Sequence, residues 1–293
     1  MRSVGAVIPL MAGIAIATGS MHQPTHQPTH QPKAPAPSTI SSAPSVNHTL
    51  VVTANDFAFT GMTPRVSAGW VTIRMINAGK ELHMFASASV PPGMTTAGML
   101  DSIMKDRVPK NFTEWGGPNA VASGDTTTVT LFLPAGSYVV GCFVVSPDGK
   151  PHFMKGMMGS FEVVASKDAG TPPASDRNVL LSTYHIVMDG GQLTKGLHVF
   201  KVRNTAKEPH DFVILKVLPG HTVAQALKWF GNPPVGAPAA EPIGGTTALH
   251  LNEQGYVQAR FTPGTYVLVC WMQTDNKPHF QMGMQKVLTV PAT

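Results

Sequence analysis

The chain has 293 residues, of which 43% are apolar and 13% charged, and its formal net charge is +5. This length suits two domains of ordinary size with packed cores. The positive charge is not gathered into Lys/Arg runs, so the composition excludes a basic nucleic-acid-binding surface of the usual kind. The 28 Gly and 26 Pro favour short strands joined by turns, which indicates an all-β protein.

Residues 1–20 have the pattern of an export signal. Arg2 precedes an apolar run from Val4 to Ala17, which is short and Gly-interrupted for a membrane span. We expect the protein to be periplasmic or secreted, with this segment either cleaved or retained as an N-terminal anchor. No integral membrane domain is expected beyond it.

Residues 21–47 are rich in His, Pro and Ser. Repeated Thr-His-Gln-Pro units place His22, His26 and His30 along this stretch. Such a composition cannot bury a core and predicts a flexible tether. A second interpretation is a loose metal-capturing tail, because neutral imidazoles bind copper and zinc.

The rest of the chain is an internal duplication. Three segments of the first half recur in the second: Asn77–His83 as Asn204–His210, Pro134–Tyr138 as Pro263–Tyr266, and Lys150–Phe153 as Lys277–Phe280. The offset is 127 residues at the histidines and 128 at Cys142 and Cys270. We therefore predict a domain at 48–165, a Gly/Pro linker at 166–175 and a second domain at 176–293.

Each repeat reads as strands with one helical interruption. Period-two alternation predicts strands at Trp70–Ile76, Thr126–Leu133 and Leu197–Arg203. Helical spacing marks Thr95–Lys105 and Thr222–Phe230, which occupy matching places in the two repeats. About seven strands per repeat fit a Greek-key sandwich.

Four residues with metal-binding side chains recur in the same order in both repeats. The first set is His83, Cys142, His152 and Met157, and the second is His210, Cys270, His279 and Met284. A soft thiolate, two imidazoles and a weak thioether suit copper that cycles between two oxidation states. Met154, Met158 and Met282 lie close in sequence to the two Met positions and leave the thioether ligand open.

The position of each cysteine fits this interpretation. Tyr138, Val140 and Cys142 share one face of a strand, so the thiol lies at the strand end, where the next loop can return a His and then a Met. A disulfide between Cys142 and Cys270 is the alternative, but equivalent positions in two separate domains are not expected to meet.

The spacing Gly-x-Tyr-x-x-x-Cys followed by His-x-x-x-Gly-Met resembles the cupredoxins, and the loop from His152 to Met157 is most similar to the type 1 copper loop of copper nitrite reductases. The resemblance covers residues 48–165 and 176–291. It implies two tandem cupredoxin-like Greek-key β-sandwich or barrel domains and two type 1 copper ions per chain. Many cupredoxins carry Asn after the first His, whereas this chain has Met84 and Asp211.

Two-domain members of this family include enzymes, which carry a His beside the Cys ligand and further His pairs. Here the residues flanking the cysteines are Gly141, Phe143, Val269 and Trp271, and no His-x-His pair occurs. We therefore predict a non-enzyme that passes single electrons to or from a redox partner protein. The alternatives are copper storage or delivery, or an oxidase-like or nitrite-reductase-like enzyme. The oligomeric state is left open.

Overall fold

The computed structural model describes residues 47–292 except 106, 110 and 232–235. The expected export signal lies outside the described residues, and so does the expected tether apart from Asn47, together with His22, His26 and His30. None of the helices among the described residues has both the length and the apolar character needed to cross a bilayer.

The first repeat contains nine strands, one α-helix and one 3₁₀ helix within the described residues. They are β1 (Thr49–Asn55), β2 (Ala58–Thr60), β3 (Arg65–Ser67), β4 (Gly69–Asn77), β5 (Ala86–Ser89), α1 (Thr96–Met104), β6 (Thr113–Gly116), β7 (Thr126–Leu133), β8 (Gly136–Gly141), η1 (His152–Lys155) and β9 (Met158–Val164).

The second repeat contains ten strands and the same two kinds of helix, again within the described residues. They are β10 (Arg177–Ser182), β11 (His185–Met188), β12 (Gly196–Asn204), β13 (His210–Val217), α2 (Val223–Trp229), β14 (Ala240–Leu249), β15 (Gln254–Phe261), β16 (Gly264–Val269), β17 (Gln273–Thr274), β18 (Lys277–Pro278), η2 (His279–Met282) and β19 (Gln285–Val290). Both repeats exceed the expected seven strands because several are only two to four residues long.

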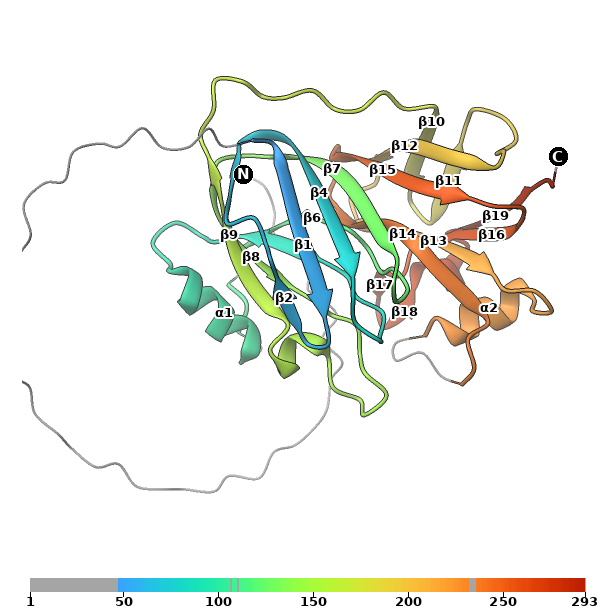
Figure 1. The fold of residues 1–293 in the computed structure, drawn as a ribbon, viewed down its shortest axis with the longest axis horizontal. Helices are drawn as coiled ribbons and strands as arrows, with labels where there is room; N and C mark the ends of the chain where they lie inside the picture. The colour runs from blue at the N-terminus through green and yellow to red at the C-terminus, as the bar shows by residue number, and fades with distance from the viewer. Residues whose placement is uncertain (1–46, 106, 110, 232–235, 293) are drawn as a thin grey trace, which may run out of the picture. The chain divides into compact units, whose positions relative to one another are not determined.

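The predicted all-β fold with one helical interruption per repeat is confirmed (Figure 1). The first repeat has a sheet β2–β1–β4–β7 and a sheet β3–β9–β8–β5–β6, and the second repeats this plan with β11–β10–β12–β15 and β14–β13–β16–β19. Within the first sheet of each repeat, β1 pairs parallel with β4 and β10 pairs parallel with β12. Strands of distant sequence thus become neighbours, as a Greek key requires.

The predicted helices begin and end where the sequence pattern placed them. Thr95 caps α1 by accepting a hydrogen bond from Gly98 N, and Thr222 with Gln225 forms a capping box on α2. Each helix covers the outer face of a Cys-bearing strand: Val139 on β8 packs with Met99 of α1, and Val267 on β16 packs with Leu227 of α2. Both faces of these strands are therefore buried, which fixes the position of the residue at their end.

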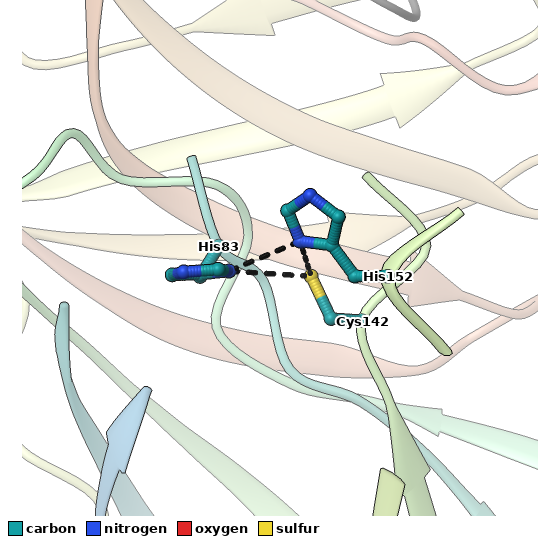
Figure 2. A group of neighbouring side chains, drawn as sticks. All are labelled: His83, Cys142 and His152. Carbon is teal, nitrogen blue, oxygen red and sulfur yellow. Dashed lines mark hydrogen bonds between the residues drawn. The ribbon is translucent and has the colours of Figure 1, made fainter. Parts of the chain in front are cut away.

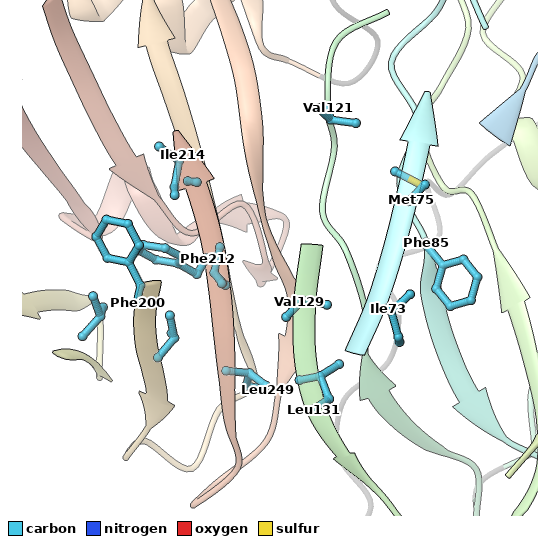
Figure 3. Close-up of a cluster of buried hydrophobic side chains, with 14 of the residues drawn as sticks. Ile73, Met75, Phe85, Val121, Val129, Leu131, Phe200, Phe212, Ile214 and Leu249 are labelled. Atoms are coloured by element: carbon cyan, nitrogen blue, oxygen red, sulfur yellow. The ribbon is translucent and has the colours of Figure 1, made fainter. Parts of the chain in front are cut away.

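The two repeats share one hydrophobic core. β7 and β15 pair antiparallel with Val129 opposite Val257, two residues that are 128 apart and so occupy equivalent places. Pro118 lies opposite Thr246, again 128 apart, at a second contact between the repeats. Equivalent residues that face each other mark an approximate two-fold axis through this seam. Figure 3 shows Val129 and Leu131 of the first repeat in one cluster with Phe212 and Leu249 of the second.

A buried carboxylate lies on β6. Burial and, to a smaller extent, the charge of Glu253 together raise the pKa of Glu114 from 4.5 to about 7, and only 16% of the Glu114 side chain is exposed. The folded state thus holds this proton more tightly than the unfolded chain. The resulting stability is present in full below pH about 4.5 and is lost as the pH rises through about 7.

We expect Glu114→Gln to remove this part of the pH dependence, because the amide is neutral throughout. At pH 8 the variant should have the higher free energy of unfolding, by roughly 1–3 kcal/mol. Urea unfolding of both proteins between pH 4.5 and 8 measures the effect, with Glu162→Gln at an exposed carboxylate as the control. A wild-type protein whose stability does not fall over this range would contradict the expectation.

Candidate metal centres

Each cysteine lies directly after a buried strand. Cys142 follows β8 and Cys270 follows β16, and both are buried free thiols. Tyr138, Val140 and Cys142 all belong to the shared core, whereas Val139 packs under α1. The predicted strand face is therefore confirmed, and it directs the thiol into the sandwich.

The loop after each cysteine returns the second His and the Met. His152 is the first residue of η1, which ends at Gly156 with φ 104°, a backbone conformation that favours Gly. Met157 follows, and its carbonyl accepts a hydrogen bond from Cys142 N (3.1 Å) while its own N–H donates to His152 O (3.0 Å). His279, Gly283 and Met284 repeat this arrangement beside Cys270.

Three of the four predicted residues in each repeat converge (Figure 2). His83 Nδ1 and His152 Nδ1 are 3.1 Å apart, and Cys142 Sγ lies 3.9 and 3.4 Å from them. In the second repeat the Nδ1 atoms of His210 and His279 are 3.0 Å apart, and Cys270 Sγ lies 3.6 and 3.4 Å from them. Donors ~2.0–2.3 Å from one metal ion have separations of this size.

We name the groups centre 1 (His83, Cys142, His152) and centre 2 (His210, Cys270, His279).

The imidazoles of centre 1 are set up to receive a cation. Burial lowers the pKa of both His83 and His152, so the rings are neutral near pH 7. His83 Nε2 lies 2.8 Å from Asp56 Oδ1, and His152 Nε2 lies 3.0 Å from Glu81 Oε2. A neutral ring that donates from Nε2 to a carboxylate keeps a lone pair on Nδ1. Two such lone pairs 3.1 Å apart repel each other unless a cation lies between them.

Burial also determines the protonation state of the two thiols. It raises the pKa of Cys142 to about 12, opposed by hydrogen bonds from Met84 N and Val144 N. Burial raises the pKa of Cys270 as well, and the charge of Asp211 raises it further. Each sulfur therefore keeps its proton near neutral pH, and only a bound cation would replace that proton. The donor set fits copper, with a soft sulfur and two imidazoles in each buried group, and supports two copper sites per chain.

The main chain braces each sulfur after the first His, and in the second repeat the Asp211 side chain also hydrogen-bonds the Cys270 sulfur. Met84 N donates to Cys142 Sγ at 3.4 Å, and Asp211 N makes the equivalent bond to Cys270. The absence of Asn at these two positions therefore leaves this support in place. Asp211 adds a carboxylate that accepts a hydrogen bond from Trp271 N at 2.6 Å.

The structure shows where the methionines lie but does not assign a thioether ligand. Met157 and Met284 are fully buried and belong to the same core as the cysteines. Met154 is 50% exposed, and Met158 and Met282 are partly exposed. Met157 and Met284 stay our predicted fourth ligands.

Several residues that support the centres were not identified from the sequence. Asn77 and Asn204 were noted only as part of a repeated motif, yet each fixes the turn that carries the first His. Asn77 Nδ2 donates to Glu81 O (2.8 Å) and Val121 O (3.0 Å), and Asn204 makes the same two bonds to Glu208 O and Leu249 O. The repetition of Asn-x-x-Lys-Glu-x-His was the signal that could have revealed this role.

The remaining described histidines are dispersed. His198 contacts Asp176 and Thr194 O, His185 contacts Thr183 O, and His48 lies 3.9 Å from Asp168. Across the described part of the chain, centres 1 and 2 are the two places where three or more His, Cys, Asp or Glu ligand atoms come together.

No protein-family model matches this chain, and no curated protein matches it in sequence. Solved structures that resemble it include auracyanin from Roseiflexus castenholzii, with 21% identity over 39% of this chain and 94% of that chain (TM-score 0.28). The blue copper oxidase from Nitrosomonas europaea matches with 16% identity over 83% and 85% (TM-score 0.25). The copper-containing nitrite reductase from Thermus scotoductus SA-01 matches with 14% identity over 83% and 61% (TM-score 0.24).

Because these identities lie below 25% and the TM-scores below 0.5, the assignment of the centres depends on their own geometry. That geometry consists of two Greek-key repeats, each with a buried Cys at the end of a central strand and two imidazoles whose Nδ1 atoms converge on its sulfur. The chain has two tandem copies of one all-β Greek-key fold, with one buried His–Cys–His group in each.

Proposed function

We propose that this protein is an exported copper protein that transfers single electrons to or from a redox partner, with one type 1 copper ion in each repeat. The observation that carries the proposal is the convergence of two imidazole Nδ1 atoms and one thiol sulfur, buried in each repeat, with all pairs 3.0–3.9 Å apart. Copper bound there would supply a one-electron couple.

The residues of the chain hold these donors in one arrangement. His83 follows a turn fixed by Asn77, Cys142 is fixed by β8, and His152 is fixed by η1 and Glu81. A donor set that is fixed on several elements changes little when the charge of its ion changes. Such rigidity favours electron transfer, and Phe57 and Tyr184, packed edge-on to His152 and His279 at 4.9 and 5.0 Å, limit the access of water.

The burial of the ligands favours electron transfer over copper storage or delivery. Each of the six His and Cys ligands is at most 1% exposed. A protein that hands over copper must open its ligands to a partner, whereas an electron needs no such opening. We therefore place storage or delivery second.

An enzyme would need an open coordination position for its substrate. In each repeat the predicted Met completes four ligands around one ion, and the residues beside the cysteines carry no further ligand. We propose that the protein is not an enzyme, that it acts in the periplasm or outside the cell, and that its partner is another redox protein.

The visible spectrum of the copper-loaded protein tests this proposal. We expect an intense thiolate-to-copper band, two copper ions per chain, and full bleaching and recovery on one-electron reduction and reoxidation of each ion. We expect no turnover of nitrite or of a phenol. A third tightly bound copper, together with turnover that His198→Ala abolishes, would contradict the carrier proposal, and a colourless protein free of copper would contradict copper binding altogether.

A further inference from the structure

The two centres share their donors but differ in what surrounds the imidazoles. In centre 1 both Nε2 atoms meet a carboxylate: Asp56 at His83 (2.8 Å) and Glu81 at His152 (3.0 Å). Centre 1 therefore has two carboxyl groups in direct contact with its ligands.

Neither contact exists in centre 2. His279 Nε2 pairs with the neutral hydroxyl of Thr274 at 2.9 Å, and His210 Nε2 is buried without a hydrogen-bond partner. Thr183 occupies the place of Asp56, since Phe57 and Tyr184 next to them both pack on the second His of their centre. Glu208 is the counterpart of Glu81, but its Oε2 is buried without a hydrogen-bond partner.

These differences act on the two oxidation states of a bound copper ion unequally. An imidazole that donates to a carboxylate is a stronger electron donor to the metal on its other nitrogen. Stronger donation, and the negative charge itself, favours Cu(II) over Cu(I). In centre 2 one imidazole has a neutral hydroxyl partner and the other has none, and the charge of Glu208 acts on His279 without a hydrogen bond, so this preference is weaker.

One carboxylate in centre 2 reduces this difference between the centres, because its negative charge also favours Cu(II). Asp211 hydrogen-bonds the sulfur of Cys270, and it also accepts hydrogen bonds from Trp271 N, Met272 N and the side chain of Asn119. It contacts no imidazole in the hydrogen-bond pattern of the described residues. Centre 1 thus has two direct carboxylate contacts to its ligands, whereas centre 2 has one, to its sulfur, where three further hydrogen bonds stabilise the carboxylate.

We propose that centre 1 is the low-potential member and centre 2 the high-potential member of an unequal redox pair, set by Asp56 and Glu81. This inference rests on the proposed copper function and deepens it. At intermediate potentials an electron resides on centre 2, and centre 1 stays oxidised. The two residues are positioning residues that act through the imidazoles, because neither is itself a ligand.

Spectroelectrochemical titration of the full chain and of two single-centre variants tests the ordering. Cys270→Ser leaves centre 1 and Cys142→Ser leaves centre 2. We expect the preference for Cu(II) over Cu(I) to be at least tenfold greater in centre 1, which corresponds to a potential lower by about 59 mV for one electron. The full chain should then titrate in two steps.

In the Cys270→Ser protein, Asp56→Asn and Glu81→Gln keep an acceptor oxygen but remove the charge. Both should raise the potential of centre 1 while the thiolate-to-copper band stays in place. Asp148→Asn is the matched control, because this carboxylate lies in the same Cys-to-His loop and pairs with Lys155 rather than an imidazole.

Equal potentials or a reversed order in copper-loaded proteins would overturn the ordering alone, and an equal shift from Asp148→Asn would overturn its assignment to Asp56 and Glu81. Failure of both single-centre variants to bind copper would overturn the proposed function and the ordering with it. Competition for Cu(I) and for Cu(II) with chelators gives the same ordering by a second route, since a lower potential means weaker Cu(I) binding relative to Cu(II).

Discussion

Replacement of Cys142 by serine should remove one of the two copper ions and the charge-transfer absorption of centre 1, and leave centre 2 intact. The sulfur is fully buried, and it is the soft donor of its group, at 3.4 and 3.9 Å from the two Nδ1 atoms. A serine hydroxyl is a hard and weakly acidic donor that cannot replace it. Elemental analysis should give one copper per chain for Cys142→Ser, one for Cys270→Ser and none for the double variant.

Met154→Ser is the matched control for this result, because Met154 lies in η1 between the second His and Met157 but is 50% exposed. It should leave two copper ions and the full absorption. Loss of both metals from either single cysteine variant would show that the ligands are shared between the repeats and would refute two independent centres.

The second large effect is expected at Asn77. This fully buried amide donates to Glu81 O and Val121 O and accepts from Gly79 N at 3.0 Å, so it fixes the turn that leads into His83. Asn77→Ala leaves two carbonyls and one N–H without these bonds, at a cost of about 2–4 kcal/mol in the free energy of unfolding. The same change should weaken copper binding in centre 1 more than in centre 2.

Urea unfolding and copper titration of the variant measure both effects, and Asn204→Ala should reverse the preference between the centres. Asn55→Ala is the control, since its side chain makes an exposed bond to Thr60 and should change the stability by less than about 0.5 kcal/mol. Equal weakening of the two centres by Asn77→Ala would contradict a local role.

The sequence predicted those features that depend on local pattern and on order along the chain. The bounds of α1 and α2 followed from helical spacing at matching places in the two repeats, and the structure adds that Thr95 and Thr222 cap their first turns. The convergence of His83, Cys142 and His152 followed from the recurrence of one ordered set of ligand types, which chance does not produce twice.

The features that the sequence did not reveal depend on pairs of residues that only the fold brings together. Asp56 and His83 are 27 residues apart, and Glu81 and His152 are 71 apart, so no spacing rule links either pair. The seam was missed for a related reason. β7 and β15 are ordinary alternating strands, and nothing in either one shows that it pairs with the other repeat instead of ending a sheet.

The contact between the two repeats also has a consequence for the ratio of the two centres. Val129 lies opposite Val257, and Pro118 lies opposite Thr246. Each repeat therefore contributes the equivalent surface to the contact. A surface of this kind is complementary to itself, as in a two-fold homodimer. Because the two repeats are covalently connected, one copy of each is always present. A centre with carboxylate–imidazole contacts is therefore always accompanied by one without them. A dimer of identical chains would hold two equal centres and could not make that distinction.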